Sequence, residues 1–402
     1  MELKEKHIIL GVSGGIAAYK SVELLRLLTK QGAHVRVVMT ENAGWFVGAT
    51  TFQALSGNPV CSDLFEKSGD ASIRHIDWAQ EADGVVIAPA TANIVGKLAN
   101  GLADDALSTL LLAVTCPVMV CPSMNTHMYE NAAVQRNLET LRKDGIFVLE
   151  PDAGELACGT TGPGRLPDPP EILDRLTGFL TTKDLAGKRL LVTAGPTREP
   201  MDPVRFISNP SSGKMGFAVA RAAEHRGAEV TLISGPTHLP NPFCVEVIRV
   251  ETAQEMAEAV FARFDETDIV VKTAAVSDYR PETYIERKVK KSEDEKTLPL
   301  IKNQDILREL GRRKEGQILV GFAAETEDLE KNAGQKLSEK NLDIIAGNIV
   351  GTPDSGFGSD RNAVTFFMKD GRKDSFPSME KEAVAHVLLD RVAALAKGVS
   401  ST

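Results

Sequence analysis

The chain has 402 residues, which is long for a single hydrophobic core, so we expect two domains. Its 55 acidic and 46 basic residues give a net charge of -9, which argues against a surface for nucleic acid or anionic membranes. No apolar run is long enough to span a bilayer and "MELKEKHIIL" lacks a signal-peptide core, so we expect a cytoplasmic protein. The five cysteines are odd in number and lack C-x-x-C spacing, which disfavours a disulfide framework or a zinc site.

Short apolar segments alternate with helical patterns in the first part of the chain. The predicted strands are "HIILGV", "HVRVVMT", "DGVVIAPAT", "CPVMVCPS" and "GIFVLEP". Leucines at helical spacing predict a helix from roughly Ile16 to Lys30, directly after the first strand. Strands that are apolar on both faces and separated by helices indicate a parallel sheet. We therefore expect a doubly wound α/β domain of the flavodoxin-like kind.

A segment dense in Gly and Pro, "DAGELACGTTGPGRLPDPPEIL", ends this pattern. After a helix from roughly Pro170 to Leu180, new strands begin, and we place the boundary near Leu185, giving domains 1–185 and 186–402. The later strands are "RLLVTAG", "EVTLISG", "CVEVIRV", "DIVVKTAAV", "QILVGFAAE" and "LDIIAGNIV". Two further strands around Asp370 and Gly371 predict a terminal hairpin. The second domain is therefore expected to be Rossmann-like, with an added antiparallel hairpin.

A glycine-rich turn follows the first strand in "LGVSGGIAAYKS", which contains Ser13 and Gly14. Small residues there let backbone N–H groups and the helix dipole face a phosphate. Thr40, Thr91 and Asn125 follow other strands, and the carboxyl ends of parallel strands line one crevice. The pattern indicates a site for a phosphorylated ligand. The alternatives are a turn that only permits tight packing, and loops whose polar residues only favour turns.

A long loop, "TAGPTREPMDPVRFISNPSSGKMG", follows the first strand of the second domain and opens a helix. Arg205 supplies a planar donor, Asn209 an amide, and "SSGKMG" a helix N-terminus for anions. The loop is not a Walker A motif, and the alternative is a solvated loop. Lys336 and Lys340 stand four apart in a helical pattern, where like charges are unfavourable unless an anion binds.

Several of these motifs resemble a known family. "GVSGGIAAYK", "APATAN", "LADDALS", "PSMNTHMYENAAVQRNL" and "GELACGTTGPGRLPDP" are similar to the FMN-dependent cysteine decarboxylases, specifically the phosphopantothenoylcysteine decarboxylase half of the bifunctional coenzyme A enzymes. "TAGPTREPMDPVRFISNPSSGKMG", "AAVSDYRP" and "GFAAET" resemble the phosphopantothenate-cysteine ligase half. The resemblance covers essentially the whole chain.

The resemblance implies a flavin site in the first domain. FMN would take up two electrons from the thiol-bearing carbon, which lets the carboxylate leave as carbon dioxide. Asn125 would hold that carboxylate, His75 would act as a base, and Cys158, on a flap, would donate the final proton. From the residues alone, Cys158 could be a structural thiol and His75 a surface residue before a helix. Tyr129 stands where the family usually has Trp, and we expect this change to alter packing only. The implied FMN contacts are Ser13, Gly14, Thr40, Ala88, Thr91 and Ser108.

The resemblance implies a CTP and Mg²⁺ site in the second domain. A phosphopantothenate carboxylate would attack the α-phosphate of CTP, and the cysteine amine would then displace CMP, with Asn209 and Lys288 as catalytic residues. The implied binding residues are Arg205, Thr273, Ala274, Ala275, Asp278, Lys288, Asp305, Ile306, Phe322, Lys336 and Lys340, with Asp278 near the metal. Alternatives are capping or turn roles for Asp278 and Asp305, a core role for Phe322 and a solvated loop around Lys288. Lys272 receives no role.

We therefore expect a bifunctional enzyme that joins phosphopantothenate and cysteine with CTP, then decarboxylates phosphopantothenoylcysteine to phosphopantetheine. The family suggests a homo-oligomer with trimeric contacts between flavin domains and dimeric contacts between ligase domains. One rival is a non-catalytic flavoprotein of the same fold, which could lack His75 or Cys158, and this chain has both. The other rival is a nicotinamide dehydrogenase, disfavoured because the spaced G-x-G-x-x-G is absent.

Overall fold

The computed structural model describes residues 3–63, 71–156, 159, 161–288, 297–325, 328–349 and 358–399. The chain divides into two compact units, Met1–Thr181 and Thr182–Thr402. Leu185, where we expected the boundary, is buried in the core of the second unit. Within the described ranges, no helix has the length and apolar character needed to cross a membrane.

The sheet of the first unit is parallel, with strand order β3-β2-β1-β4-β5-β6. Every residue of β4 is buried, as expected for a strand covered by helices on both faces. The strands of this sheet are β1 (His7–Val12), β2 (His34–Met39), β3 (Val60–Cys61), β4 (Gly84–Ala90), β5 (Val118–Pro122) and β6 (Phe147–Val148), whereas β7 (Asp152–Glu155) and β8 (Thr161–Arg165) pair separately. The predicted doubly wound fold of this part is confirmed.

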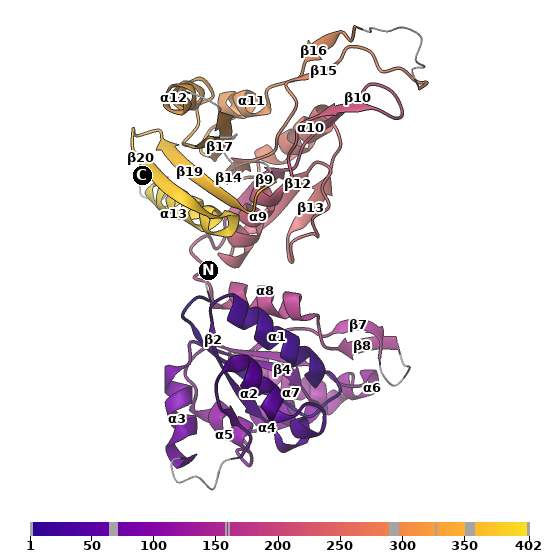
Figure 1. Cartoon of the computed structure of the whole chain (residues 1–402), viewed down its shortest axis with the longest axis vertical. Coiled ribbons are helices and arrows are strands. Elements are labelled where there is room, and N and C mark those ends of the chain that lie inside the picture. Colours follow the sequence, from indigo (N-terminus) through magenta and orange to yellow (C-terminus); the bar gives the residue numbers. More distant parts are fainter. Residues whose placement is uncertain are drawn as a thin grey trace. The chain divides into compact units, whose positions relative to one another are not determined.

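Helices cover both faces of this sheet (Figure 1). They are α1 (Ala18–Lys30), the 3₁₀ helix η1 (Glu41–Trp45), α2 (Ala49–Ser56), α3 (Ala71–Glu81), α4 (Ala92–Ala99), α5 (Ala106–Ala113), α6 (Thr126–Tyr129), α7 (Ala132–Lys143) and α8 (Pro169–Leu180). The core on one face contains residues of α1, α2 and α8, and the core on the other face contains residues of α3, α4, α5 and α7. Leu24, Leu25 and Leu28 of α1 are fully buried, which explains the leucine spacing in the sequence.

The sheet of the second unit has strand order β13-β12-β9-β14-β17-β18-β19-β20. Its strands are β9 (Arg189–Ala194), β12 (Glu229–Ser234), β13 (Glu246–Arg249), β14 (Ile269–Lys272), β17 (Ile318–Glu325), β18 (Ile344–Ile349), β19 (Arg361–Met368) and β20 (Lys373–Glu380). The first six in this order pair in parallel, whereas β19 and β20 are antiparallel, so the predicted hairpin is confirmed.

The helices of the second unit also form two layers (Figure 1). They are α9 (Lys214–His225), α10 (Ala253–Phe264), α11 (Ile306–Arg313), α12 (Leu329–Glu339) and α13 (Lys381–Val399). One core joins the sheet to α9 and α13, and a second joins it to α10, α11 and α12. Strand order reverses between β9 and β14, just as it reverses between β1 and β4 in the first unit, and ligands of open α/β sheets bind at such points.

Close backbone contacts hold the loops at this edge of the second unit. A Cβ atom at Gly235, after β12, would lie 1.8 Å from the carbonyl oxygen of Pro196, after β9. Gly213 precedes α9 with a φ of 79°, and a Cβ there would lie 2.7 Å from the Thr237 side chain. The two strand ends and the start of α9 therefore lie in close contact, with the Thr237 side chain packed at Gly213.

Three short antiparallel ribbons were not predicted: β7–β8, β10 (Arg198–Pro200) with β11 (Phe206–Ser208), and β15 (Tyr279–Pro281) with β16 (Leu300–Lys302). The β7–β8 ribbon lies in the segment that Gly and Pro marked as irregular. At Gly164 the ribbon packs directly on the loop after β5, because a Cβ there would lie 2.2 Å from the carbonyl oxygen of Met124. The glycines thus permit a close contact here.

Candidate active sites

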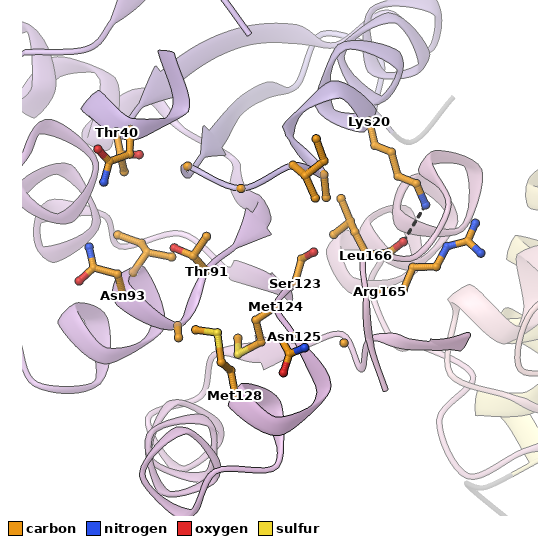
Figure 2. Close-up of a pocket in the computed structure, with 18 of the residues that line it drawn as sticks. Lys20, Thr40, Thr91, Asn93, Ser123, Met124, Asn125, Met128, Arg165 and Leu166 are labelled. Atoms are coloured by element: carbon orange, nitrogen blue, oxygen red, sulfur yellow. Dashed lines mark hydrogen bonds between the residues drawn. The ribbon is translucent and has the colours of Figure 1, made fainter. Parts of the chain in front are cut away.

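The first unit has a cavity of about 870 Å³ at the carboxyl ends of β1, β4 and β5. Thr40, Thr91 and Asn125 line it from three different loops (Figure 2), and Gly14 lines it from a fourth. Such cavities of roughly 300–1,000 Å³ are typical of small-molecule sites. The structure therefore brings together the polar strand ends on which the sequence argument depended.

Ser13, Ala88 and Ser108 lie behind the cavity wall. Ser13 Oγ donates to the Pro89 carbonyl at 2.8 Å and accepts from the Thr91 backbone N–H at 2.9 Å. Ala88 is buried in β4, and Ser108 forms a capping box with Asp105 at the start of α5. The side chains of Ser13 and Ser108 thus hold lining residues in place, and the contact of all three residues with a cofactor stays a prediction.

Thr40 has a buried hydroxyl oxygen that no described residue engages in a hydrogen bond. Buried hydroxyl groups normally have a partner, so the oxygen is placed to bind a ligand in the cavity that Thr40 lines. The Gly14 turn before α1 and Thr91 at the N-cap of α4 add backbone N–H groups that suit a phosphate. The residues present therefore fit a phosphorylated cofactor such as a flavin mononucleotide.

Three cations around the cavity were missed by sequence reasoning. Lys20 is buried, and its ammonium donates to the Leu166 carbonyl at 2.8 Å (Figure 2). It also donates to Asp168 at 2.7 Å. The hydrogen bond from Lys20 is the main cause that lowers the pKa of Asp168. Lys97 and Arg165 also line the cavity. Lys20 and Arg165 lie inside the motifs that carry the family resemblance, but a single cation in a motif does not indicate what it binds.

Asn125 lies at the N-cap of α6, where its Oδ1 accepts from the His127 N–H at 2.9 Å. Met124 and Met128 line the same side of the cavity (Figure 2). Tyr129 is not among the lining residues, and its hydroxyl donates to Glu150 at 2.5 Å. Burial, together with Glu150, raises the pKa of Tyr129 to about 12, so this phenol stays protonated at neutral pH.

Two residues expected to act here are described incompletely or not at all. Cys158 lies outside the described residues. The backbone of His75 lies within α3, whereas we expected it just before a helix, and its side chain lies outside the description. The roles of both residues stay predictions.

The second unit has a cavity of about 360 Å³ at the carboxyl ends of β14 and β17. Asn209, Thr273, Ala274, Ala275 and Phe322 line it, together with the start of α9. Asn209 donates its side-chain amide to the Ala275 carbonyl at 3.1 Å, which ties the long loop to the end of β14. An amide, a hydroxyl and a helix N-terminus thus face one space that suits an anion.

A second group of expected residues gathers around Lys272, which also lines this cavity. Lys340 ends α12 and lies 2.8 Å from Asp305, which caps α11 and accepts from the Arg308 N–H at 3.1 Å. Burial alone would raise the pKa of Asp305. The pKa is nevertheless lowered, and the hydrogen bond from Lys340 is the largest of the causes that lower it. Lys336 and Asp278 complete the electrostatic surroundings of Lys272.

The remaining expected residues lie apart from the cavity lining. Ile306 is buried in the core. Arg205 donates from Nε to Asp202 at 3.0 Å and again from Nη2, and Asp202 is buried. Lys288 is exposed. In the described part of the chain, no three His, Cys, Asp or Glu residues cluster as a metal site, so Asp278 as a metal ligand stays a prediction.

Known families match both units. The Flavoprotein family matches residues 1–181, and the DNA/pantothenate metabolism flavoprotein C-terminal domain matches residues 185–395. The solved C-terminal domain of a coenzyme A biosynthesis bifunctional protein is 43% identical, with a TM-score of 0.47, covering 54% of this chain and 100% of that chain.

Similarity also extends over nearly the whole chain. The coenzyme A biosynthesis bifunctional protein of Bacillus subtilis is 50% identical over 98% of this chain and 98% of its own length. That of Escherichia coli is 48% identical, again over 98% of both chains. The chain therefore belongs to the family of bifunctional coenzyme A biosynthesis proteins.

Proposed function

We propose that the first unit is an FMN-dependent phosphopantothenoylcysteine decarboxylase and the second unit a CTP-dependent phosphopantothenate-cysteine ligase. As a member of its family, the chain is a bifunctional enzyme with decarboxylase and ligase activities. The observation that carries the assignment of the first site is the buried Thr40 hydroxyl in a cavity shared with Gly14 and Asn125.

In the first unit, Gly14, Thr40 and Thr91 would hold FMN. When bound, FMN supplies an acceptor for two electrons from the carbon that bears the substrate thiol. The Asn125 amide orients the substrate carboxylate, and Met124 and Met128 limit the access of water. His75 takes a proton from the substrate, and Cys158 returns one to the product.

In the second unit, CTP lies with its charges near Lys336 and Lys340 and a phosphate near the start of α9. The phosphopantothenate carboxylate attacks the α-phosphate, and pyrophosphate leaves. Lys288 stabilises the negative charge that develops, and Asp278 would help to hold Mg²⁺, which when bound would supply positive charge to the phosphates. Asn209 then orients the acyl group for attack by the cysteine amine, and CMP leaves.

Each unit also presents apolar side chains that support an oligomer. Ile16 and Tyr19, at the edge of the flavin cavity, are each 62% exposed, and Trp45 is 85% exposed. Val204 and Phe206 are exposed near the β10–β11 ribbon of the second unit. Apolar surfaces can mark contacts with partners, which supports an oligomer. The trimeric contacts of the first unit and the dimeric contacts of the second that we propose are those that the family resemblance implies.

The decarboxylase assignment is tested on the purified full chain. We expect it to carry FMN, and Cys158→Ser to release carbon dioxide but accumulate an unsaturated thiol in place of the saturated product. Release of FAD, or a normal saturated product at the normal rate from Cys158→Ser, would overturn this assignment.

The ligase assignment is tested with CTP labelled at its α-phosphate. We expect an acyl-cytidylate in the unchanged chain, little or none in Lys288→Gln, and a normal amount in Lys302→Gln, an exposed control lysine in β16. Decarboxylation of supplied phosphopantothenoylcysteine should continue in both variants. Normal acyl-cytidylate formation in Lys288→Gln would remove Lys288 from the mechanism.

A further inference from the structure

We propose that Lys272 is a catalytic residue of the ligase unit: it accepts the proton that the cysteine amine loses when it attacks the activated carboxylate. This inference rests on the proposed ligase function. Lys272 is the last residue of β14, in the interior of the sheet, and pairs with Thr193 of β9 and Gly321 of β17. It therefore lies at the edge where the ligand crevice of a parallel sheet forms.

The direction of the Lys272 side chain follows from the strand. Val270, two residues earlier, packs in the core with Ile306 of α11 and Ala333 of α12. Because alternate residues of a strand share a face, Lys272 points toward the same helices, where α11 begins and α12 ends. Its cross-strand neighbours are Thr193 and Gly321, and the side chains of Leu307 and Leu342 pack over Gly321.

Lys272 has charged neighbours, but none of those described binds its ammonium group directly. Among the described residues, none forms a hydrogen bond or ion pair with its ammonium group, and the nearby Asp305 is already engaged by Lys340 at 2.8 Å. Asp278 attracts the ammonium group, and Lys336 repels it. Burial first, and repulsion from Lys340 second, lower the pKa of Lys272 to about 8. A neutral amine is thus accessible near the pH at which a general base works best.

Lys272 also lies where the reacting atoms must meet. It lines the same cavity as Asn209 and the start of α9. Its other neighbours, Asp305 and Lys340, belong to the group expected to hold the nucleotide. The bond between the acyl carbon and the phosphate oxygen joins these two parts, so it would lie beside Lys272.

The proposed step balances as follows. The nitrogen lone pair of cysteine forms a bond to the acyl carbon, and the bond from that carbon to the cytidylate oxygen breaks with its electron pair on CMP. The nitrogen, positively charged after attack, loses its proton to the neutral Nζ of Lys272. The resulting ammonium group then releases the proton to water, and the side chain is ready for another cycle.

The test separates the two half-reactions in the full-length protein. Acyl-cytidylate is formed first from CTP labelled at the α-phosphate and phosphopantothenate, and cysteine is then added in a single turnover. In Lys272→Met and Lys272→Arg we expect the intermediate to form at a near-normal rate but its transfer to cysteine to slow about 100-fold. The rise of the transfer rate near pH 8 should disappear in both variants. Lys331→Met, an exposed control on α12, should behave as the unchanged chain.

The outcomes distinguish this inference from the function on which it rests. If the unchanged chain forms no acyl-cytidylate, the proposed ligase function fails and this inference fails with it. If the intermediate forms and both variants transfer it normally, only the role of Lys272 is overturned. Normal transfer in Lys272→Arg alone would make Lys272 a fixed cation, and loss of intermediate in Lys272→Met would make it a nucleotide ligand; either result also overturns the proposal.

Discussion

Lys272→Met should make the second unit more stable at neutral pH. Burial is the main reason why the pKa of Lys272 falls from 10.5 to about 8, so the folded state holds this charge unfavourably. One pKa unit corresponds to about 1.4 kcal/mol, and the shift therefore costs on the order of 3 kcal/mol at pH 7. Methionine has a similar length and no charge, so the variant should recover most of this free energy.

The pH dependence of the free energy of unfolding follows from the direction of this pKa shift. The folded-state pKa lies below the unfolded one, so the cost is fully present below pH 8, declines between pH 8 and pH 10.5, and is absent above that range. Stability of the unchanged chain should therefore gain from rising pH in this window, and the advantage of Lys272→Met should vanish there.

Native-state hydrogen exchange of the amides in β9, β14 and β17 measures this free energy of unfolding for the second unit alone. Tryptophan fluorescence provides an internal control, because the only two tryptophans of the sequence, Trp45 and Trp78, lie in the first unit and should report no change. Equal exchange in the variant and the unchanged chain at pH 7 would refute the reasoning, as would an advantage that persists at pH 10.5 in urea unfolding of the second unit followed by circular dichroism.

Three further predictions concern other parts of the two sites. Gly14→Ala should reduce flavin content at least 10-fold by visible absorbance after dialysis, because the new Cβ would lie 2.4 Å from the Asn42 side chain, whereas Gly44→Ala, with nothing within 4 Å, should retain it. Asp202→Asn should raise the ligase KM for phosphopantothenate about 10-fold and leave the decarboxylase unchanged, since it removes the charge that holds Arg205; an unaltered KM would count against a binding role for Arg205. Tyr129→Phe should lower the stability of the first unit by about 1 kcal/mol in fluorescence-monitored unfolding, through loss of the Glu150 hydrogen bond, while a large fall in decarboxylation would contradict the view that Tyr129 only packs.

The sheets were predictable because their strands carry strong signals. Long apolar runs such as those of β4 and β9 are buried on both faces, and the residues that end them mark the ligand edge. The ribbons were not predictable, because their short strands contain Gly, Pro and charged residues that also favour loops. At Gly164 the decisive fact is a contact with the distant Met124, which local sequence does not indicate.

The candidate sites were predictable to the extent that their residues follow strands or belong to long motifs. Thr40 and Asn125 could be assigned to one crevice in this way. Lys272 could not be interpreted, because a single lysine at the end of a strand resembles an ordinary polar terminus. Its proposed role depends on its position beside Asp305 and Lys340, which approach it only because α11 begins where α12 ends.

The close contacts at Gly213 and Gly235 affect how much conformational entropy the loops around the second cavity must lose when a ligand binds. The segments after β9 and β12 and the entrance to α9 are already pressed together before any ligand arrives. Ordering one residue costs about 1–2 kcal/mol, so a loop ordered in advance leaves more of the contact energy available for affinity. Because any larger residue at these glycines would separate the segments, ligand preference here can change through side chains at the edge of the cavity more readily than through the shape of the loops.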